Sequence, residues 1–299
     1  MIFAFCRDSL DPTHPERDFA REVDAARACG AEVVLLDHDA AAQGDPQQAA
    51  AGVATRAAST PAVYRGWMLT PPRYAGLYRE LAGRRVKLIN DAAAYRRCHY
   101  LPDSYPAIAG HTPRSVWVHR SEGFELDTLM QRLEVFGDRP LILKDYVKSL
   151  KHAWDEACFI PSASDAGHVN RVVEAFLEWQ GEDLNEGLVF REFVELASVG
   201  VHPKSGMPLA EEYRAVVLDG RVLQVVPYWD AESYAGATPP PGEWLSAVAA
   251  GVQSRFFTLD VARLKSGGWI VVELGDGQVA GLPDHADVEA LIQALAQGA

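Results

Sequence analysis

Two acidic residues, Asp260 and Glu273, lie in apolar segments that have the pattern of β-strands. The segments cover 256–264 and 269–274 and flank a Lys-Ser-Gly-Gly turn, about which the two acids are nearly symmetric. Antiparallel pairing would bring the carboxylates onto neighbouring strands, where they repel each other unless a cation lies between them. Hard oxygen ligands of this kind favour Mg²⁺. The alternative is a surface hairpin with unrelated acids, although the apolar neighbours argue against exposure.

Two basic residues lie in similar apolar surroundings. Lys144 is inside the strand-like run 140–147, and burying its ammonium is costly unless an anion such as a phosphate meets it. Arg214 lies near the start of the apolar run 212–218, and its planar guanidinium suits a phosphate or a carboxylate. Each has a simpler explanation: Lys144 could lie at an exposed sheet edge, and Arg214 could pair with Glu212 or another nearby acid.

A further segment, 187–195, interleaves apolar and charged residues near its end, with the sequence GLVFREFVE. This pattern is typical of a half-buried strand that leaves its sheet, or of an edge strand whose charges are solvated. An acidic chain with a few cations placed in apolar strands is consistent with a site that binds phosphates through metal ions.

The elements that carry these residues follow two different patterns. Over the first third of the chain, strands alternate with helices, which predicts an open α/β unit. We expect 31–37 to be a buried parallel strand because it is a continuous apolar and β-branched run. The other predicted strands here are 2–6, 61–67 and 85–90, the predicted helices are 16–29 and 71–81, and the Ala- and Gln-rich segment 40–58 is ambiguous.

The rest of the chain predicts an α+β part dominated by antiparallel hairpins. Asp219-Gly220 between the apolar runs 212–218 and 222–228 is a strong hairpin signal. We predict loops at 198–208 and 229–243. The other predicted strands are 114–119, 140–147, 157–161 and 187–196, and the predicted helices are 124–136, 165–179 and 285–296.

Length and composition limit the possible functions. The chain has 299 residues, of which 48% are hydrophobic, and its 28 Lys and Arg against 41 Asp and Glu give a formal net charge of -13. This balance argues against a protein that binds nucleic acid or anionic membranes, because both need a basic face. The four cysteines form no CxxC pattern, so a structural zinc site is not expected. The first apolar run is too short for a signal peptide, and we expect a cytoplasmic protein.

Taken in chain order, these segments resemble the ATP-grasp superfamily of carboxylate–amine ligases, and most of all its clade named for signature arginines and a lysine. The resemblance covers about residues 85–284 and is strongest in KDYVKS, FREFVE, EEYRAVVLDG, FFTLDVA and VVELGDG. It implies a Rossmann-like α/β pre-ATP-grasp domain over 1–110, a small lid subdomain over 111–188, and a C-terminal subdomain over 189–299. Antiparallel sheets of the two subdomains would clamp the nucleotide.

The resemblance implies that four basic residues act on phosphates. Lys144 and Lys148 would bind the phosphates of ATP. Arg191 would reach phosphate or substrate, and Arg214 would stabilise the γ-phosphate and the acyl-phosphate oxygens. We treat Arg214, Lys148 and Arg191 as the candidate catalytic residues.

The resemblance also assigns the hinge between the subdomains. Glu192 and the backbone of Phe193 and Val194 would meet adenine, and Glu195 would accept the ribose hydroxyls. A long glycine-rich lid is missing, and the segment 148–152 could cover the phosphates instead.

The metal site would consist of Asp260 and Glu273, with Glu273 able to bridge two Mg²⁺ ions. Many members of the superfamily have an asparagine two residues after the bridging glutamate, where this chain has Gly275. Asp276 or Gln278 could supply the missing oxygen, and we take Asp276 as the candidate third ligand.

Some residues near these segments remain open. His152 and Trp154 could cover phosphates, or they could be packing or surface residues. Four residues near the domain junction could bind a substrate carboxylate or form a salt bridge between domains. They are Tyr95, Arg96, Arg97 and Arg114.

The function implied by the resemblance is an ATP-dependent ligase. A carboxylate would take the γ-phosphate to give an acyl phosphate and ADP, and an amine would then displace phosphate to give an amide. The partners would be small-molecule acids and amines, or a peptide, with ATP and Mg²⁺ as cofactors. The alternatives are a peptide- or protein-modifying ligase, a phosphotransferase, and a catalytically inactive nucleotide-binding module. The sequence does not specify the acid, the nucleophile or the oligomeric state.

Overall fold

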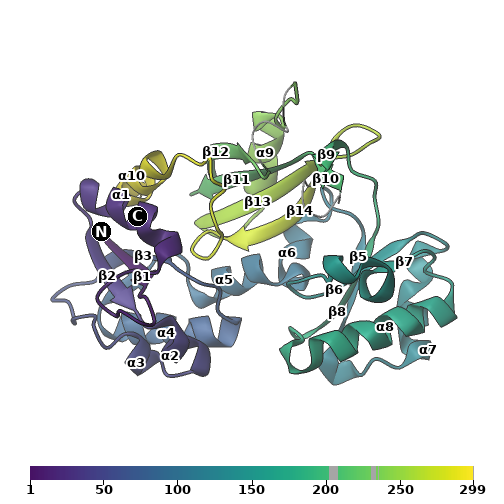
Figure 1. The fold of residues 1–299 in the computed structure, drawn as a ribbon, viewed down its shortest axis with the longest axis horizontal. Helices are drawn as coiled ribbons and strands as arrows, with labels where there is room; N and C mark the ends of the chain where they lie inside the picture. Colours follow the sequence, from purple (N-terminus) through teal and green to yellow (C-terminus); the bar gives the residue numbers. More distant parts are fainter. Residues whose placement is uncertain (202–207, 230–233, 235, 299) are drawn as a thin grey trace.

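The first sheet of the computed structural model, which describes residues 1–201, 208–229, 234 and 236–298, is parallel. Its strand order is β2-β1-β3-β4, and the interior strand β1 is completely buried. The strands are β1 (Ile2–Cys6), β2 (Glu32–Leu36), β3 (Thr60–Arg65) and β4 (Val86–Leu88), and the helices are α1 (Ala20–Ala28), α2 (His38–Gln43), α3 (Pro46–Ala49) and α4 (Pro71–Gly83). The predicted open α/β unit is confirmed (Figure 1).

The strand β2 differs from its prediction. It lies at the edge of the sheet, Glu32 is exposed, and Val33 to Leu35 are half-buried, so the predicted buried strand is wrong. A continuous apolar run predicts a strand but does not give its place in a sheet. Two helices that the sequence did not predict, α5 (Ala92–His99) and α6 (Leu101–Ile108), connect this sheet to the second one.

The second sheet is antiparallel, with the strand order β5-β8-β6-β7. Its strands are β5 (Ser115–His119), β6 (Leu141–Asp145), β7 (Phe159–Ile160) and β8 (Gly187–Glu192), and its helices are α7 (Leu126–Leu133) and α8 (Ala166–Gln180). The apolar side of α8, with Val169, Val172 and Phe176, packs into the core of this sheet (Figure 1). A π-helical turn over Trp154–Cys158 makes β7 shorter than predicted.

The third sheet is also antiparallel, with the strand order β12-β11-β13-β14. Its strands are β11 (Glu212–Leu218), β12 (Arg221–Pro227), β13 (Phe256–Arg263) and β14 (Trp269–Asp276). Both predicted hairpins are confirmed. The turn between β11 and β12 has φ of 49° at Asp219 and 76° at Gly220, the left-handed backbone that two-residue hairpin turns require.

The two predicted loops contain regular structure. The strand β9 (Ser198–Val201) pairs with β10 (Pro208–Ala210), so the predicted loop at 198–208 is wrong at both ends, and 202–207 lie outside the described residues. Residues 230–233 and 235 of the second predicted loop also lie outside them. The helix α9 (Gly242–Ala249) begins at the end of that segment.

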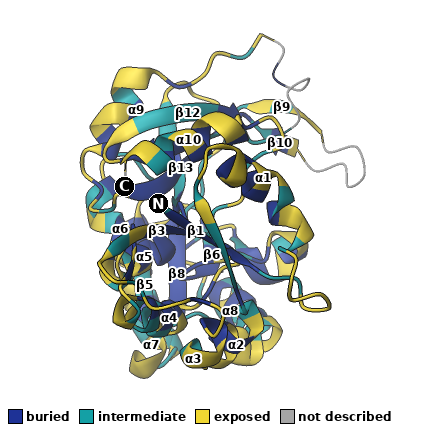
Figure 2. Ribbon diagram, turned by 90° about the vertical axis from the view of Figure 1, so that its left-hand side faces the viewer, coloured by how far each residue is buried: buried dark blue, intermediate teal, exposed yellow. Residues whose placement is uncertain are grey.

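The last described helix, α10 (Val288–Gly298), packs against α1 of the first sheet (Figure 1). Its Leu291, Ile292 and Leu295 are buried in the same core as the residues of β1 and β3. Figure 2 shows these strands buried and the outer sides of the helices exposed. Within the described ranges, every helix is too short or too polar to span a membrane.

A buried ion pair strengthens this connection between distant parts of the chain. Arg65, at the end of β3, contacts the carboxylate of Glu22 with its Nε at 2.6 Å and its Nη2 at 2.8 Å. Its Nη1 donates to the carbonyl oxygens of Gly277 and Ala280 in the loop after β14. The first and third sheets are therefore joined through side-chain hydrogen bonds as well as through α10.

Candidate functional site

The β13–β14 hairpin places Asp260 directly opposite Glu273, which is the pairing expected from the turn. Residues opposite each other in an antiparallel pair extend from the same face of the sheet. Asp260 is buried, whereas 44% of the side chain of Glu273 is exposed. One face of the third sheet therefore carries two carboxylates side by side, one of which is open to its surroundings.

Arg214 on β11 lies opposite Asp260 on the other side. Its Nε and Nη2 donate to the two carboxylate oxygens of Asp260 over 2.7 and 2.6 Å, and its Nη1 donates to the carbonyl oxygen of Gly281 over 2.6 Å. The ring of Tyr228 lies 5.1 Å from the guanidinium carbon. Burial alone would lower the pKa of Arg214, but the hydrogen bonds and charge of Asp260 raise it above its usual value. The arginine, which the sequence predicts at this site, is rigidly oriented and stays charged.

Lys144 on β6 belongs to the second sheet but lies close to this acidic pair. Its Nζ is 3.8 Å from Oε1 of Glu273, and its side chain is almost completely buried. Burial lowers the pKa of Lys144, and the charge of Glu273 opposes that shift. A cation of the second sheet and a carboxylate of the third thus face each other.

Arg191 on β8 contacts the backbone of β14. Its guanidinium donates to the carbonyl oxygens of Val271 at 2.9 Å and Val272 at 2.6 Å, and to Oγ1 of Thr112 at 2.7 Å. The pairing of β13 with β14 shifts by one residue here, so that Val272 forms a β-bulge immediately before Glu273. Burial lowers the pKa of Arg191 to about 10. The structure therefore uses Arg191 to fix the bulge that orients Glu273.

The four predicted hinge residues follow β8 directly. The carboxylate of Glu192 pairs with Arg139 at 3.3 Å, and the exposed carboxylate of Glu195 pairs with Lys265 at 3.1 Å. The backbone N–H of Phe193 donates to the carbonyl oxygen of Pro140 over 2.9 Å. Val194 is half-buried between them. The two carboxylates therefore have local partners, which a bound ligand would have to share.

Three half-buried aromatic rings meet beside this hinge. Trp154 is stacked on Phe159 with 5.3 Å between ring centroids, and both rings contact Phe193 edge-on, at 5.9 and 5.3 Å. Flat apolar surfaces of this kind can pack against a purine base. The sequence analysis left Trp154 open and missed Phe159, because the cluster joins residues from the π-helical turn, β7 and the hinge.

The profile of a known domain decides the family. It describes an ATP-grasp domain, family 3 of the clade named for its arginines and lysine, and it matches residues 134–295, which is more than half of the chain. The chain belongs to this family. No curated protein matches it.

The ATP-grasp fold extends over the whole chain. The solved RimK domain protein ATP-grasp from Sphaerobacter thermophilus DSM 20745 is 14% identical, with a TM-score of 0.59 and 97% of both chains covered. D-cycloserine synthetase DcsG is 16% identical, with a TM-score of 0.58 and 99% of both chains covered. The ATP-grasp ligase PsnB, solved with a variant of its minimal precursor, Mg and ADP, is 14% identical, with a TM-score of 0.57 over 99% of this chain and 95% of that one. At these identities the likeness shows the fold alone.

Lys148 of this ATP-grasp chain lies in the turn after β6 and is exposed. The Asp145 carboxylate fixes the turn by accepting hydrogen bonds from the backbone N–H groups of Val147 and Lys148. Burial, and then the charge of Lys148, lower the pKa of His99 on α5 to about 4. His152, which the sequence left open, is exposed and lies edge-on to Trp179 with 5.3 Å between centroids.

Asp276 does not join the two acids of the ATP-grasp site. It lies three residues after Glu273 on the same strand and therefore extends from the opposite face of the sheet. Its carboxylate accepts hydrogen bonds from Nδ2 of Asn90 at 2.6 Å and from the backbone N–H of Gln278 at 3.0 Å. Burial raises the pKa of Asp276 to about 6. Gln278 is also buried, and its amide donates to the hydroxyl of Tyr74.

The residue that the structure adds to this face is Glu212, two positions before Arg214 on β11. Residues two apart on a strand share a face, so the Glu-x-Arg spacing could have indicated it. Glu212 is buried, and burial followed by the charge of Asp260 raises its pKa to about 7.

The four junction candidates have local partners instead of a place at the ATP-grasp site. Tyr95 stacks on Tyr74 at 3.8 Å and its hydroxyl donates to the carbonyl oxygen of Leu69. The three arginines bind nearby acceptors: Arg96 the carboxylate of Asp103, Arg97 the carbonyl oxygen of Gln253, and Arg114 that of Val135. Among the residues that the structure describes, none of the four contacts Asp260 or Glu273.

Proposed function

We propose that this ATP-grasp chain is an ATP-dependent ligase that joins a carboxylate to an amine through an acyl phosphate and releases ADP and phosphate. One observation carries the proposal: Lys144 of the second sheet and Arg214 of the third flank the Asp260–Glu273 pair. Cations at that position suit the negative charge of a phosphoryl group in transfer, and carboxylates suit its metal ions.

Mg²⁺ would bind to Asp260 and Glu273. Both offer the hard oxygen donors that Mg²⁺ prefers, and Mg²⁺ commonly takes one or two protein carboxylates together with phosphate oxygens. The half-exposed Glu273 fits this pattern, because its carboxylate can face a ligand. When bound, the ion would draw charge from the phosphate oxygens.

The nucleotide would lie between the second and third sheets. The rings of Trp154, Phe159 and Phe193 would pack against the base, and Glu192 and Glu195 lie nearby at the hinge. Lys144 would meet phosphate oxygens, which would also neutralise its buried ammonium. Lys148, exposed in the next turn, would reach the phosphates from the second sheet.

The chemistry has two steps. In the first, a substrate carboxylate oxygen bonds to the γ-phosphorus, the bond from that phosphorus to the β–γ bridging oxygen breaks, and ADP leaves. In the second, the amine nitrogen bonds to the acyl carbon, the carbon–oxygen bond to phosphate breaks, and the amine loses a proton. Arg214 would stabilise the charge on the phosphoryl oxygens in both steps, and Arg191 would keep Glu273 oriented.

The acid could be a small molecule or the side chain of a peptide. Both occur among structural neighbours, since DcsG is a D-cycloserine synthetase and PsnB was solved with a precursor peptide. No oxygen or nitrogen of the described site selects between them, so the assay has to include both kinds of acid.

Hydroxylamine trapping tests the proposal directly. The protein with ATP and Mg²⁺ is given sets of amino acids and acidic peptides, with and without hydroxylamine, and ADP and hydroxamate are measured. A hydroxamate that Asp260→Asn and Glu273→Gln abolish would support a ligase, and Glu178→Gln on α8 is the matched control. A stable phosphorylated product formed without any amine would indicate a phosphotransferase, and no ADP with any acid would indicate a nucleotide-binding module.

A further inference from the structure

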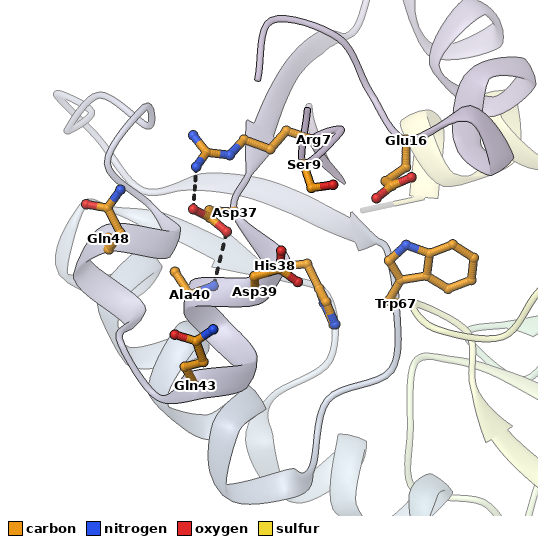
Figure 3. A pocket seen from close by; sticks show the side chains of 10 residues that line it. All are labelled: Arg7, Ser9, Glu16, Asp37, His38, Asp39, Ala40, Gln43, Gln48 and Trp67. Carbon is orange, nitrogen blue, oxygen red and sulfur yellow. Dashed lines mark hydrogen bonds and ion pairs between the residues drawn. The ribbon is translucent and has the colours of Figure 1, made fainter. Parts of the chain in front are cut away.

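A cavity of about 520 Å³ lies in the first sheet, apart from the proposed nucleotide site. Its walls come from the segments that follow β1, β2 and β3, at the carboxyl edge of the parallel strands (Figure 3). From β1 the chain continues to β2 on one side and later to β3 on the other, so the strand order reverses at β1. Open parallel sheets bind their ligands outside the carboxyl ends of the strands at such a reversal.

The walls of this cavity are already ordered. The guanidinium of Arg7 forms an ion pair with Asp37, and the Asp37 carboxylate also accepts a hydrogen bond from the backbone N–H of Ala40 at 3.0 Å. The indole of Trp67 lies edge-on to Phe19 with 5.2 Å between centroids, while 41% of Trp67 stays exposed. Figure 3 shows Trp67 on one side of the cavity and Asp37 on the other.

The charges in the cavity favour a cation. Three carboxylates, from Glu16, Asp37 and Asp39, face one guanidinium, which leaves two negative charges. Arg7 accounts for Asp37, and neither Glu16 nor Asp39 has an ion-pair partner among the residues that the structure describes. Burial lowers the pKa of His38, which is therefore neutral at neutral pH. An anionic ligand would meet net repulsion here.

The size and the polar groups favour an organic molecule over a metal ion. A water molecule occupies about 30 Å³, so the cavity has room for many heavy atoms. Nδ1 of His38 is buried and has no hydrogen-bond partner in the described part of the chain, as expected for a polar group that a ligand would satisfy. The described residues also contain no group of three metal-ligating side chains.

We propose that this cavity binds a small organic dication, such as an aliphatic diamine or an amine that carries a guanidinium group. Its charged ends would pair with Glu16 and Asp39, and its methylene chain would lie on the exposed part of the Trp67 indole, which also attracts cations. The proposal goes beyond the ligase reaction and does not depend on it, because all the residues involved belong to the first sheet and its loops.

Calorimetric titration of the full chain with putrescine, and with 1,4-butanediol as the neutral control, tests the proposal. We expect putrescine to bind and butanediol not to bind. The double variant Glu16→Gln/Asp39→Asn should weaken putrescine binding by about tenfold or more, or about 1.4 kcal/mol. The control variant Glu174→Gln/Glu178→Gln removes the same charge from α8 and should leave binding unchanged.

Two results would overturn the proposal: no binding of putrescine, or the same affinity in both double variants. Thermal unfolding of each variant shows that the fold is retained, since the four substituted carboxylates lie on partly or fully exposed side chains. Glu273→Gln should bind putrescine as the unchanged protein does. This variant separates the proposal from the ligase assignment, because loss of ligase activity there leaves putrescine binding intact.

Discussion

Arg191 donates a hydrogen bond of 2.6 Å to the carbonyl oxygen of Val272, the residue immediately before Glu273. The arginine belongs to the second sheet and the valine to the third, so one sheet fixes the backbone of the other at the acidic pair. A β-bulge redirects a side chain, and an arginine that binds both of its carbonyls keeps that direction constant. This contact makes the geometry of Glu273 depend on the position of the second sheet.

Arg191→Lys should therefore impair catalysis while the fold survives. A lysine keeps the charge but cannot bind two carbonyls and a hydroxyl at once. We expect kcat/KM to fall by about tenfold, or about 1.4 kcal/mol, and the Mg²⁺ requirement to rise. Steady-state ADP release at several Mg²⁺ concentrations measures both. Arg139→Lys, on a half-exposed side chain, is the matched control, and equal Mg²⁺ curves for the two variants would contradict this role.

Asp276→Asn separates a structural carboxylate from a metal ligand. Because Asp276 accepts hydrogen bonds from Asn90 and Gln278 on the opposite face, we expect this variant to lose about 1–3 kcal/mol of unfolding free energy. Its Mg²⁺ dependence should match that of the unchanged protein, whereas Glu273→Gln should lose Mg²⁺-dependent turnover. Urea unfolding and Mg²⁺ titration of activity measure the two effects. A weaker Mg²⁺ response in Asp276→Asn would show that Asp276 does act at the metal.

The same aspartate should make stability depend on pH. Burial raises the pKa of Asp276 from 3.8 to about 6, so the folded protein binds more protons than the unfolded chain in that interval. Its contribution is therefore fully present below about pH 4 and decreases as the pH rises to about 6, by about 2–3 kcal/mol. The difference in unfolding free energy between the unchanged protein and Asp276→Asn, measured across this range, isolates the effect. A difference that is constant with pH would exclude it.

Trp154→Ala should weaken nucleotide binding more than turnover. Removing one ring that stacks on a base costs about 1–3 kcal/mol, so the KM for ATP should rise by about tenfold while kcat changes little. Trp179→Ala is the control, because Trp179 is exposed and contacts His152 instead of the hinge cluster. If both variants raised the KM for ATP equally, the aromatic cluster would not be the base site.

The sequence predicted the parts of the site that depend on local pairing. The position of Asp260 opposite Glu273 follows from one short turn, and hairpin register is a local property. The role of Arg191 could not be predicted in this way, since its acceptors Val271 and Val272 are 80 and 81 residues away. A strand pattern also does not show which buried acid has a distant partner.

Asp276 illustrates that last limit. Its apolar strand and its place after Glu273 suggested a third ligand, while its actual partner, Asn90, lies 186 residues earlier. The edge position of β2 and the helices α5 and α6 escaped prediction for a related reason. Sheet order and the packing of short, mixed helices are set by contacts between segments that are far apart in sequence.

The packing of α10 on α1 has a consequence for the order of folding. Leu291, Ile292 and Leu295 fill the core that β1 and β3 begin, so the first sheet lacks part of its hydrophobic cover until residues 288–298 have been synthesised. The second sheet, with α7 and α8, has a core drawn entirely from the middle of the chain. During synthesis on the ribosome, the middle of the molecule can therefore complete its core before the N-terminal part does, which reverses the usual order.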